Sequence, residues 1–275
     1  MTYRMFARRS PQLGLFLTFL VWMFGSNTSV TAGILRIETQ TGVTVAGDLL
    51  KVRVTATNKG TGPAHSVQVH LILLSERHRG PVKGRLDPGE ADTVLFERSL
   101  ARIRKGRYPL TVLVDFHDAN QYPFSAVSCT TFHFRQEANP DLLCLGSDIT
   151  LETAGDLRFS VKNLGFEPRK ARATLVLPKE LSTPRSQIDL DIDPRSEKAV
   201  VFEITNFSAL SGASYPVFCY FEYDSEASHY TAVARALVKV VKDENWFRRT
   251  KLFWLGVAIV LGVILVALQF KRKGS

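Results

Sequence analysis

The sequence predicts an all-β protein built from two β-sandwich domains in tandem, and three observations carry this prediction. Short runs of Val, Leu, Thr, Phe and Tyr alternate with polar residues, as at residues 52–56 and 67–73. Alternation with period two is typical of strands that bury one face. Turn-forming segments such as Asn58-Lys59-Gly60 separate these runs. The same landmarks then recur about 105 residues further along the chain.

The recurring landmarks keep one order and nearly constant spacing. They are an Asn-x-Gly turn, an Asp-Pro turn, a Val-x-Phe-Glu run and a Tyr-Pro pair. The paired first residues are Asn58 and Asn163, Asp87 and Asp193, Val94 and Val200, and Tyr108 and Tyr215. We therefore expect two copies of one domain, at residues 33–137 and 138–245. The linker near residues 136–142 is short, which should limit relative motion of the two domains.

The strand pattern within each repeat favours an immunoglobulin-like sandwich. Each repeat holds about seven strand-like runs in roughly 100 residues, with turns every 8–15 residues or so. Neither repeat contains a convincing amphipathic helix. One apolar face on each strand allows two sheets to pack against each other, and a repeat of this size buries enough surface to fold alone.

The first 32 residues predict a secretory signal peptide. Arg4, Arg8 and Arg9 form a basic start, residues 13–24 are apolar, and Val30-Thr31-Ala32 supplies small residues before a possible cleavage point. An uncleaved anchor is the alternative. The polar residues 26–31 favour cleavage.

Residues 246–275 predict a juxtamembrane segment, a transmembrane helix and a short basic tail. Residues 252–270 carry no charge and would span about 28 Å as a helix, close to the thickness of a bilayer core. Lys and Arg flank both ends of this run, so the positive-inside rule does not orient it. The signal peptide does: it places the two domains outside the cytoplasm, periplasmic or extracellular, with a short cytoplasmic tail.

The formal net charge of +9 resides in these two ends, and residues between them are neutral overall. Because this charge flanks the two predicted membrane-directed segments, it gives little reason to expect nucleic-acid binding. The repeats differ, however: residues 33–137 have a net charge of +4 and residues 138–241 of −3. Opposite charges could help the repeats dock or could steer different partners, or they could be ordinary surface variation.

Three cysteines follow the signal region: Cys129, Cys144 and Cys219. In an oxidising compartment one disulfide and one thiol are possible, either Cys144–Cys219 or Cys129–Cys144. Cys219 aligns with Val112 of the first repeat, which favours a small buried thiol in the core. No Cys or His spacing predicts a metal site or any other cofactor.

Two acidic clusters are candidates for chemistry. Asp115, His117 and Asp118 are expected at a hairpin tip, where a base or ligand is conceivable, but solvated loop residues are the simpler interpretation. Glu222, Asp224 and Glu226 alternate and should share one strand face, where three carboxylates could hold Ca²⁺. A solvated edge that resists strand pairing explains them as well.

Basic residues give the strongest candidates for partner binding. The first cluster is expected to be a loop around Gly80-Pro81, and the second runs from Arg98 to Arg107. Such charge could meet an acidic protein, an anionic glycan or an anionic lipid, or could simply be solvated. The candidate residues are Arg77, Arg79, Lys83, Arg85, Arg102, Arg104 and Lys105. In the predicted span, Gly256, Ala258 and Gly262 could pack against another helix.

Several turn residues of the first repeat together resemble a known group. They are Asn58, Gly60, Ala64, Pro88-Gly89-Glu90, Gly106 and Tyr108. This set resembles the CARDB/NEW3-like immunoglobulin-type modules of bacteria and archaea. The second repeat departs from the pattern, with Pro194-Arg195-Ser196 in place of Pro-Gly-Glu. The resemblance implies a sandwich fold and an adhesive or accessory role beside transporters, hydrolases or surface machinery. It implies no reaction.

Taken together, these features predict a single-pass envelope protein that is not an enzyme. We expect an accessory or scaffold subunit that presents two sandwich domains to a protein partner in a membrane complex. One alternative is an adhesin that binds a glycan or a surface, for which Tyr220, Tyr223, Tyr230 and His229 would form an aromatic platform. A second alternative is a hydrolytic or hydrolase-associated enzyme, which would need a convergent polar pocket.

Overall fold

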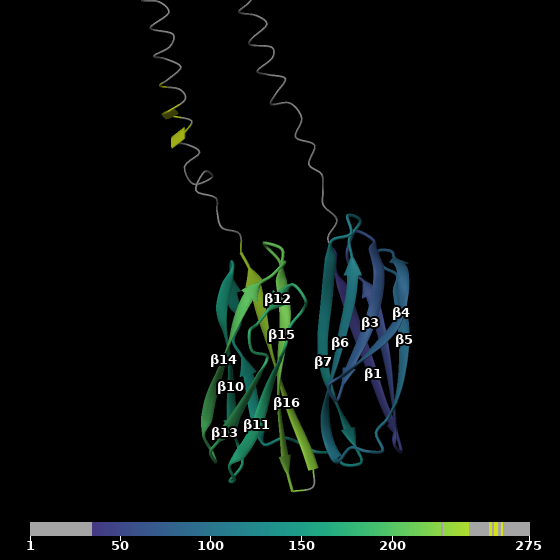
Figure 1. Cartoon of the computed structure of the whole chain (residues 1–275), viewed down its shortest axis with the longest axis vertical. Coiled ribbons are helices and arrows are strands. Elements are labelled where there is room, and N and C mark those ends of the chain that lie inside the picture. Colours follow the sequence, from purple (N-terminus) through teal and green to yellow (C-terminus); the bar gives the residue numbers. More distant parts are fainter. Residues whose placement is uncertain (1–34, 227, 242–252, 255, 258–259, 261–275) are drawn as a thin grey trace, which may run out of the picture. The chain divides into compact units, whose positions relative to one another are not determined.

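The computed structural model describes residues 35–226, 228–241, 253–254, 256–257 and 260. The fold is all-β. Sixteen strands run through the described residues, and Figure 1 shows how they are arranged. Their bounds are β1 Ile37–Ala46, β2 Leu49–Asn58, β3 Ala64–Leu73, β4 Glu76–Leu86, β5 Ala91–Ser99, β6 Lys105–His117, β7 Pro123–Phe134, β8 Leu142–Gly146, β9 Ile149–Leu151, β10 Ala154–Asn163, β11 Arg169–Val176, β12 Leu181–Ser182, β13 Gln187–Ile192, β14 Glu197–Asn206, β15 Ser214–Ser225 and β16 Ser228–Val240.

The strands form three sheets. A three-stranded sheet has the order β1-β2-β5, and a four-stranded sheet has the order β12-β14-β10-β8. The third sheet has nine strands and runs β13-β11-β15-β16-β6-β3-β4, with β7 paired to β6 and β9 paired to β16. Strands β4 and β13 are therefore the two ends of this order.

Two separate hydrophobic cores lie between these sheets, an arrangement consistent with β-sandwiches. The first core joins β1, β2 and β5 to β3, β6 and β7, and contains Leu50, Leu71 and Phe134. The second joins β8, β10 and β14 to β11, β15 and β16, and contains Phe159, Phe202 and Phe221. Cys219 is fully buried in the second core, which confirms its predicted place. All three cysteines are free thiols.

The Asn landmark of each repeat has the same buried role. Asn58 and Asn163 are both 0% exposed. The side-chain amide of Asn58 donates to the carbonyls of Gly62 and Leu86, and its oxygen accepts from the N–H of Gly60. Asn163 makes the equivalent bonds to Glu167, Ile192 and Gly165. Each Asn satisfies buried backbone groups of two turns at once, which explains why the sequence repeats it.

The Tyr landmark also has the same structural role in both repeats. The Tyr108 hydroxyl donates to the carbonyl of Arg104, and the Tyr215 hydroxyl accepts from the N–H of Leu210. In both repeats a buried tyrosine thus binds the backbone four or five residues upstream. Immunoglobulin-like sandwiches commonly contain such a tyrosine corner.

Polar side chains join the two repeats. The Glu180 carboxylate accepts from the backbone N–H and the hydroxyl of Ser125, at 2.7 Å each, and the Glu180 side chain is almost completely buried. The hydroxyls of Thr111 and Tyr220 lie 3.1 Å apart. A short parallel pairing of β16 with β6 adds a backbone connection, at Ser228–Lys105 and His229–Gly106.

The first strand differs between the repeats. In the first repeat β1 pairs with β2 over its full ten residues. In the second repeat the corresponding segment is divided: β8 pairs with β10, and β9 pairs with β16 in the other sheet. Residues 147–148 make this change of sheet, and the Asp148 carboxylate accepts from the N–H of Leu237.

Both predicted ends of the chain fall largely outside the described residues. The signal peptide at residues 1–32 and most of the predicted span at residues 252–270 lie outside them. Within the described ranges, no helix has both the length and the apolar content needed to cross a bilayer.

Candidate functional site

The first basic cluster lies in a strand, and the prediction of a loop was wrong. Arg77, Arg79, Lys83 and Arg85 all belong to β4, which pairs with β3 along its length. The Gly80-Pro81 dipeptide is accommodated where the β3–β4 register shifts, between Gln68 and His70. The Gln68 amide donates to the Gly80 carbonyl at this point.

The four basic side chains of β4 are not equivalent. Lys83 pairs with Glu90 at 3.2 Å, and Arg85 pairs with Asp87 at 2.7 Å. A hydrogen bond from the backbone N–H of Asp87, supported by Lys83, lowers the pKa of Glu90. Arg77 and Arg79 are exposed and have no ion pair among the described residues. These two charges are available to a partner, and we call them the free arginine pair.

The second basic cluster lies at the junction of the repeats. Arg102 and Arg104 lie in the turn between β5 and β6, and Lys105 is the first residue of β6. A guanidinium nitrogen of Arg104 lies 3.6 Å from the carboxylate of Asp224 in the other repeat. Arg104 therefore has an internal partner, while the side chains of Arg102 and Lys105 are exposed.

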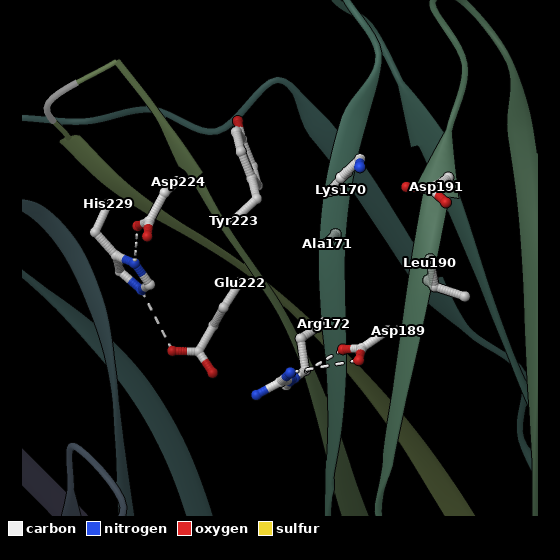
Figure 2. Close-up of a pocket in the computed structure, with 10 residues that line it drawn as sticks. All are labelled: Lys170, Ala171, Arg172, Asp189, Leu190, Asp191, Glu222, Tyr223, Asp224 and His229. Carbon is white, nitrogen blue, oxygen red and sulfur yellow. Dashed lines mark hydrogen bonds and ion pairs between the residues drawn. The ribbon is translucent and has the colours of Figure 1, made fainter.

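His229 organises the acidic cluster predicted on β15. Its imidazole lies 2.8 Å from the Asp224 carboxylate and 3.3 Å from the Glu222 carboxylate, and it stacks on Tyr108 with 4.4 Å between ring centroids. Burial lowers the pKa of His229, but the hydrogen bonds and charges of Glu222 and Asp224 outweigh burial and raise it above its ordinary value. Figure 2 shows the ring bonded to both carboxylates.

An open groove with a volume of about 720 Å³ lies beside this cluster, over β13, β11 and β15. Arg172 binds Asp189 through two nitrogens, at 2.7 and 3.3 Å (Figure 2). Lys170 and Asp191 occupy opposed positions on β11 and β13. The sequence prediction missed these four residues. The sequence did contain a signal for them, because charged residues alternate with apolar ones in Lys170-Ala171-Arg172 and Asp189-Leu190-Asp191. This alternation places the two basic residues on one face of their strand and the two acidic residues on one face of theirs.

The three carboxylates proposed for Ca²⁺ are not gathered around one point. Glu222 and Asp224 both contact His229, while Glu226 lies in the turn after β15 with a positive φ of 52°. Within the part of the chain that the structure describes, no group of three or more His, Cys, Asp and Glu side chains is arranged to hold a metal ion.

Of the three residues considered for chemistry near the β6–β7 turn, Asp115 and Asp118 have structural partners. The Asp115 carboxylate contacts the imidazole of buried His70 at 2.8 Å and the Lys179 ammonium at 2.6 Å. The Asp118 carboxylate accepts from the N–H groups of Asn120 and Tyr122 and so shapes the turn itself. Asp115 therefore helps to join the repeats.

The tyrosines proposed as a binding platform pack within the molecule. Tyr220 is buried against Thr111 of the other repeat. Tyr223 is buried, stacks on Tyr230 with 5.1 Å between centroids, and accepts from the N–H of Asp141. Tyr220 and Tyr223 are therefore not exposed to a ligand, while Tyr230 and His229 are half-buried.

Of the residues proposed for helix packing in the span, Ala258 and Gly262 lie outside the described residues. A Cβ atom added at Gly256 would meet no atom within 4 Å. Packing of the span against another helix stays a prediction.

Comparisons with known proteins add no functional assignment. No family model matches the chain, and no curated protein matches it. Solved structures match at low similarity. Alpha-2-macroglobulin from Escherichia coli is 9% identical with a TM-score of 0.30, over 75% of this chain and 18% of that one. Red sea bream transglutaminase is 12% identical with a TM-score of 0.26, over 72% and 31%. A Porphyromonas gingivalis W83 protein of unknown function is 10% identical with a TM-score of 0.31, over 75% and 99%.

The chain thus spans less than a fifth of that alpha-2-macroglobulin and less than a third of that transglutaminase.

Proposed function

We propose that this protein is a non-catalytic accessory or scaffold subunit of a membrane complex in the cell envelope. Its two halves would be tandem immunoglobulin-like sandwiches of the CARDB/NEW3-like kind. A signal peptide would export them, and a single C-terminal span would hold them outside the cytoplasm, leaving a short cytoplasmic tail. The sandwiches would then present their surfaces to a protein partner.

The use of polar side chains in the described part supports a binding role rather than a catalytic one. Asp115, Glu180 and Asp224 each bind a residue of the other repeat. A catalytic constellation needs a base and a nucleophile that face a shared substrate position. Here these three acids each bind a residue of the other repeat instead, and only Glu180 is buried, so their chemistry supports a fixed joint between two presented domains.

The observation that carries the proposal is the free arginine pair on β4. Arg77 and Arg79 lie two residues apart on an edge strand, so they project to the same side. Pro81 and the register shift interrupt the same strand, and both features oppose the addition of a foreign strand. We infer that β4 binds through its side chains to an acidic protein surface.

Affinity purification of the full chain from mild detergent, followed by mass spectrometry, tests this proposal. A partner should be recovered with the parent chain and lost at least tenfold with Arg77→Glu/Arg79→Glu. Reversing two interface charges removes about 1 kcal/mol or more of favourable interaction and adds repulsion. Arg158→Glu/Arg185→Glu is the matched control, because both residues are exposed cations of the second repeat without a side-chain ion pair in the described ranges.

Three results would contradict the proposal in different ways. Recovery of the chain alone, even after mild crosslinking, argues against any subunit role. Equal recovery of a partner with both double variants would mean that the partner binds to a surface other than β4. Specific capture on an anionic glycan array, abolished by the β4 variant, would favour the adhesin.

A further inference from the structure

Exposed apolar side chains gather at one end of the second repeat, in the loop between β14 and β15. Phe207 is 78% exposed, and Leu210 in the same loop is about half exposed. Two neighbours extend this surface. Tyr122 donates its hydroxyl to the Ser208 carbonyl, and Val241 follows the strand that the loop contacts. We call Tyr122, Phe207, Leu210 and Val241 the apolar end.

The backbone holds this loop in place, so the exposure of Phe207 is built into the fold. The N–H groups of Phe207 and Ser208 both donate to the carbonyl of buried Glu180. The Asn206 side chain closes the loop by accepting from the N–H of Ala209 and donating to its carbonyl. An aromatic side chain fixed toward solvent is costly unless something covers it.

The position of the apolar end along the chain suggests what covers it. The N–H of Gly212 donates to the Val240 carbonyl, and the N–H of Val240 donates to the Ala213 carbonyl. The loop therefore lies directly beside the end of β16. Only ten residues, 242–251, separate Val241 from the predicted span at 252–270. Ten extended residues reach at most about 35 Å.

We propose that the apolar end inserts into the interfacial region of the bilayer that holds the predicted span. Aromatic side chains favour this region because it accepts both an apolar ring and nearby polar backbone. The inference rests on the proposed membrane anchor. It adds that the second repeat touches the lipid surface itself, with Phe207 and Leu210 immersed, and so has a fixed orientation for its partner.

The same repeat supplies a matched control at its other end. Phe166 is 82% exposed, in the loop between β10 and β11. Its neighbour Leu164 donates its N–H to Asp141, whose own N–H donates to the Tyr223 hydroxyl. Tyr223 lies nine residues along β15 from Ser214, where the Phe207 loop ends. At about 3.3 Å per residue, roughly 30 Å separate these two ends.

The test compares Phe207→Cys with Phe166→Cys in the full chain, reconstituted in liposomes of phosphatidylcholine and phosphatidylglycerol. Each new thiol receives an environment-sensitive fluorophore, and lipids carrying a nitroxide on the acyl chain serve as quenchers. Burial raises the pKa of Cys129 and of Cys144 to about 12, and Cys219 is fully buried, so the native thiols should label slowly. The parent chain, treated in the same way, gives their background.

We expect the label at position 207 to lose at least half of its fluorescence and the label at 166 to keep nearly all of it. Equal quenching at both positions, or none at 207, overturns the inference. Flotation of the same liposomes tests the anchor separately. A chain that fails to float overturns the proposed function. A chain that floats with an unquenched label at 207 overturns only the lipid contact.

Discussion

The two repeats share their turns but differ in their first strand. Asn58 and Asn163 make nearly identical buried bonds, and Tyr108 and Tyr215 bind the backbone at equivalent places. By contrast, β1 stays in one sheet, while the corresponding segment of the second repeat passes from one sheet to the other through β8 and β9. Local turn chemistry is therefore repeated faithfully, whereas the path of an edge strand depends on what lies beside it.

Removing the amide of either landmark Asn should have the largest effect. Asn163→Ala leaves the buried carbonyl of Ile192 and the N–H of Gly165 without their partner. We expect a loss of about 3 kcal/mol of unfolding free energy, because each unpaired buried group costs about 1–3 kcal/mol. Asn58→Ala should cost a similar amount. Urea unfolding of the full chain in detergent, followed by circular dichroism, measures both.

Unequal losses would weaken the comparison of the two repeats. Asn206→Ala is a useful control, because Asn206 also joins two turns, through the Glu152 carbonyl and the Ala209 N–H, but is only part-buried. A loss for Asn58→Ala no larger than that of the control would mean that the shared turn has little energetic importance in the first repeat.

The difference in the first strand can be tested at a pair of glycines. A Cβ atom at Gly146 would lie 2.5 Å from the Arg235 carbonyl oxygen and 2.8 Å from a ring carbon of Phe159. A Cβ at Gly42 of β1 would meet nothing within 4 Å. Gly146→Ala should therefore cost about 2–3 kcal/mol through overpacking, and Gly42→Ala about 0.5 kcal/mol or less. Thermal unfolding of the two variants side by side measures this, and equal melting temperatures would contradict it.

Two histidines, one in each repeat, should respond to pH in opposite directions. Burial lowers the pKa of His70 despite the charge of Asp115, with Arg77 and Lys179 also opposing its protonation. Protonation of His70 then favours the unfolded chain, so stability is lost as the pH falls below about 6.5. Glu222 and Asp224 raise the pKa of His229. The stability that His229 contributes is therefore complete below about pH 6.5, and it is lost as the pH rises through the pKa of His229 in the folded protein.

The measurement is the slope of the melting temperature against pH between 5 and 8. His70→Asn should remove the loss of stability at acid pH, and His229→Gln should remove the loss of stability at alkaline pH. One unit of pKa shift corresponds to about 1.4 kcal/mol, so we expect this effect to be the smallest of the three. Unchanged slopes in both variants would show that neither histidine titrates differently in the folded protein.

The errors of the sequence prediction have a common physical origin. Gly80-Pro81 predicted a loop, yet β4 continues through it because a register shift against β3 accommodates both residues. Asp115, predicted at a hairpin tip as possible chemistry, lies in β6 and binds Lys179 across the repeat junction. The groove residues Arg172 and Asp189 were missed because they come together only when β11 pairs with β13. In each case the deciding neighbour is distant in sequence.

The amino-acid sequence by itself determined the strand content, the repeated turns and the buried positions, because side-chain alternation and turn-forming residues act over a few neighbours. The tertiary structure alone decided which polar groups meet across the repeats, which first strand changes sheets and which aromatic side chains stay exposed. These outcomes depend on contacts between residues up to about a hundred positions apart, such as Ser125 with Glu180 and Thr111 with Tyr220. No local pattern encodes such a contact, since each partner is satisfied only once the sheets have packed.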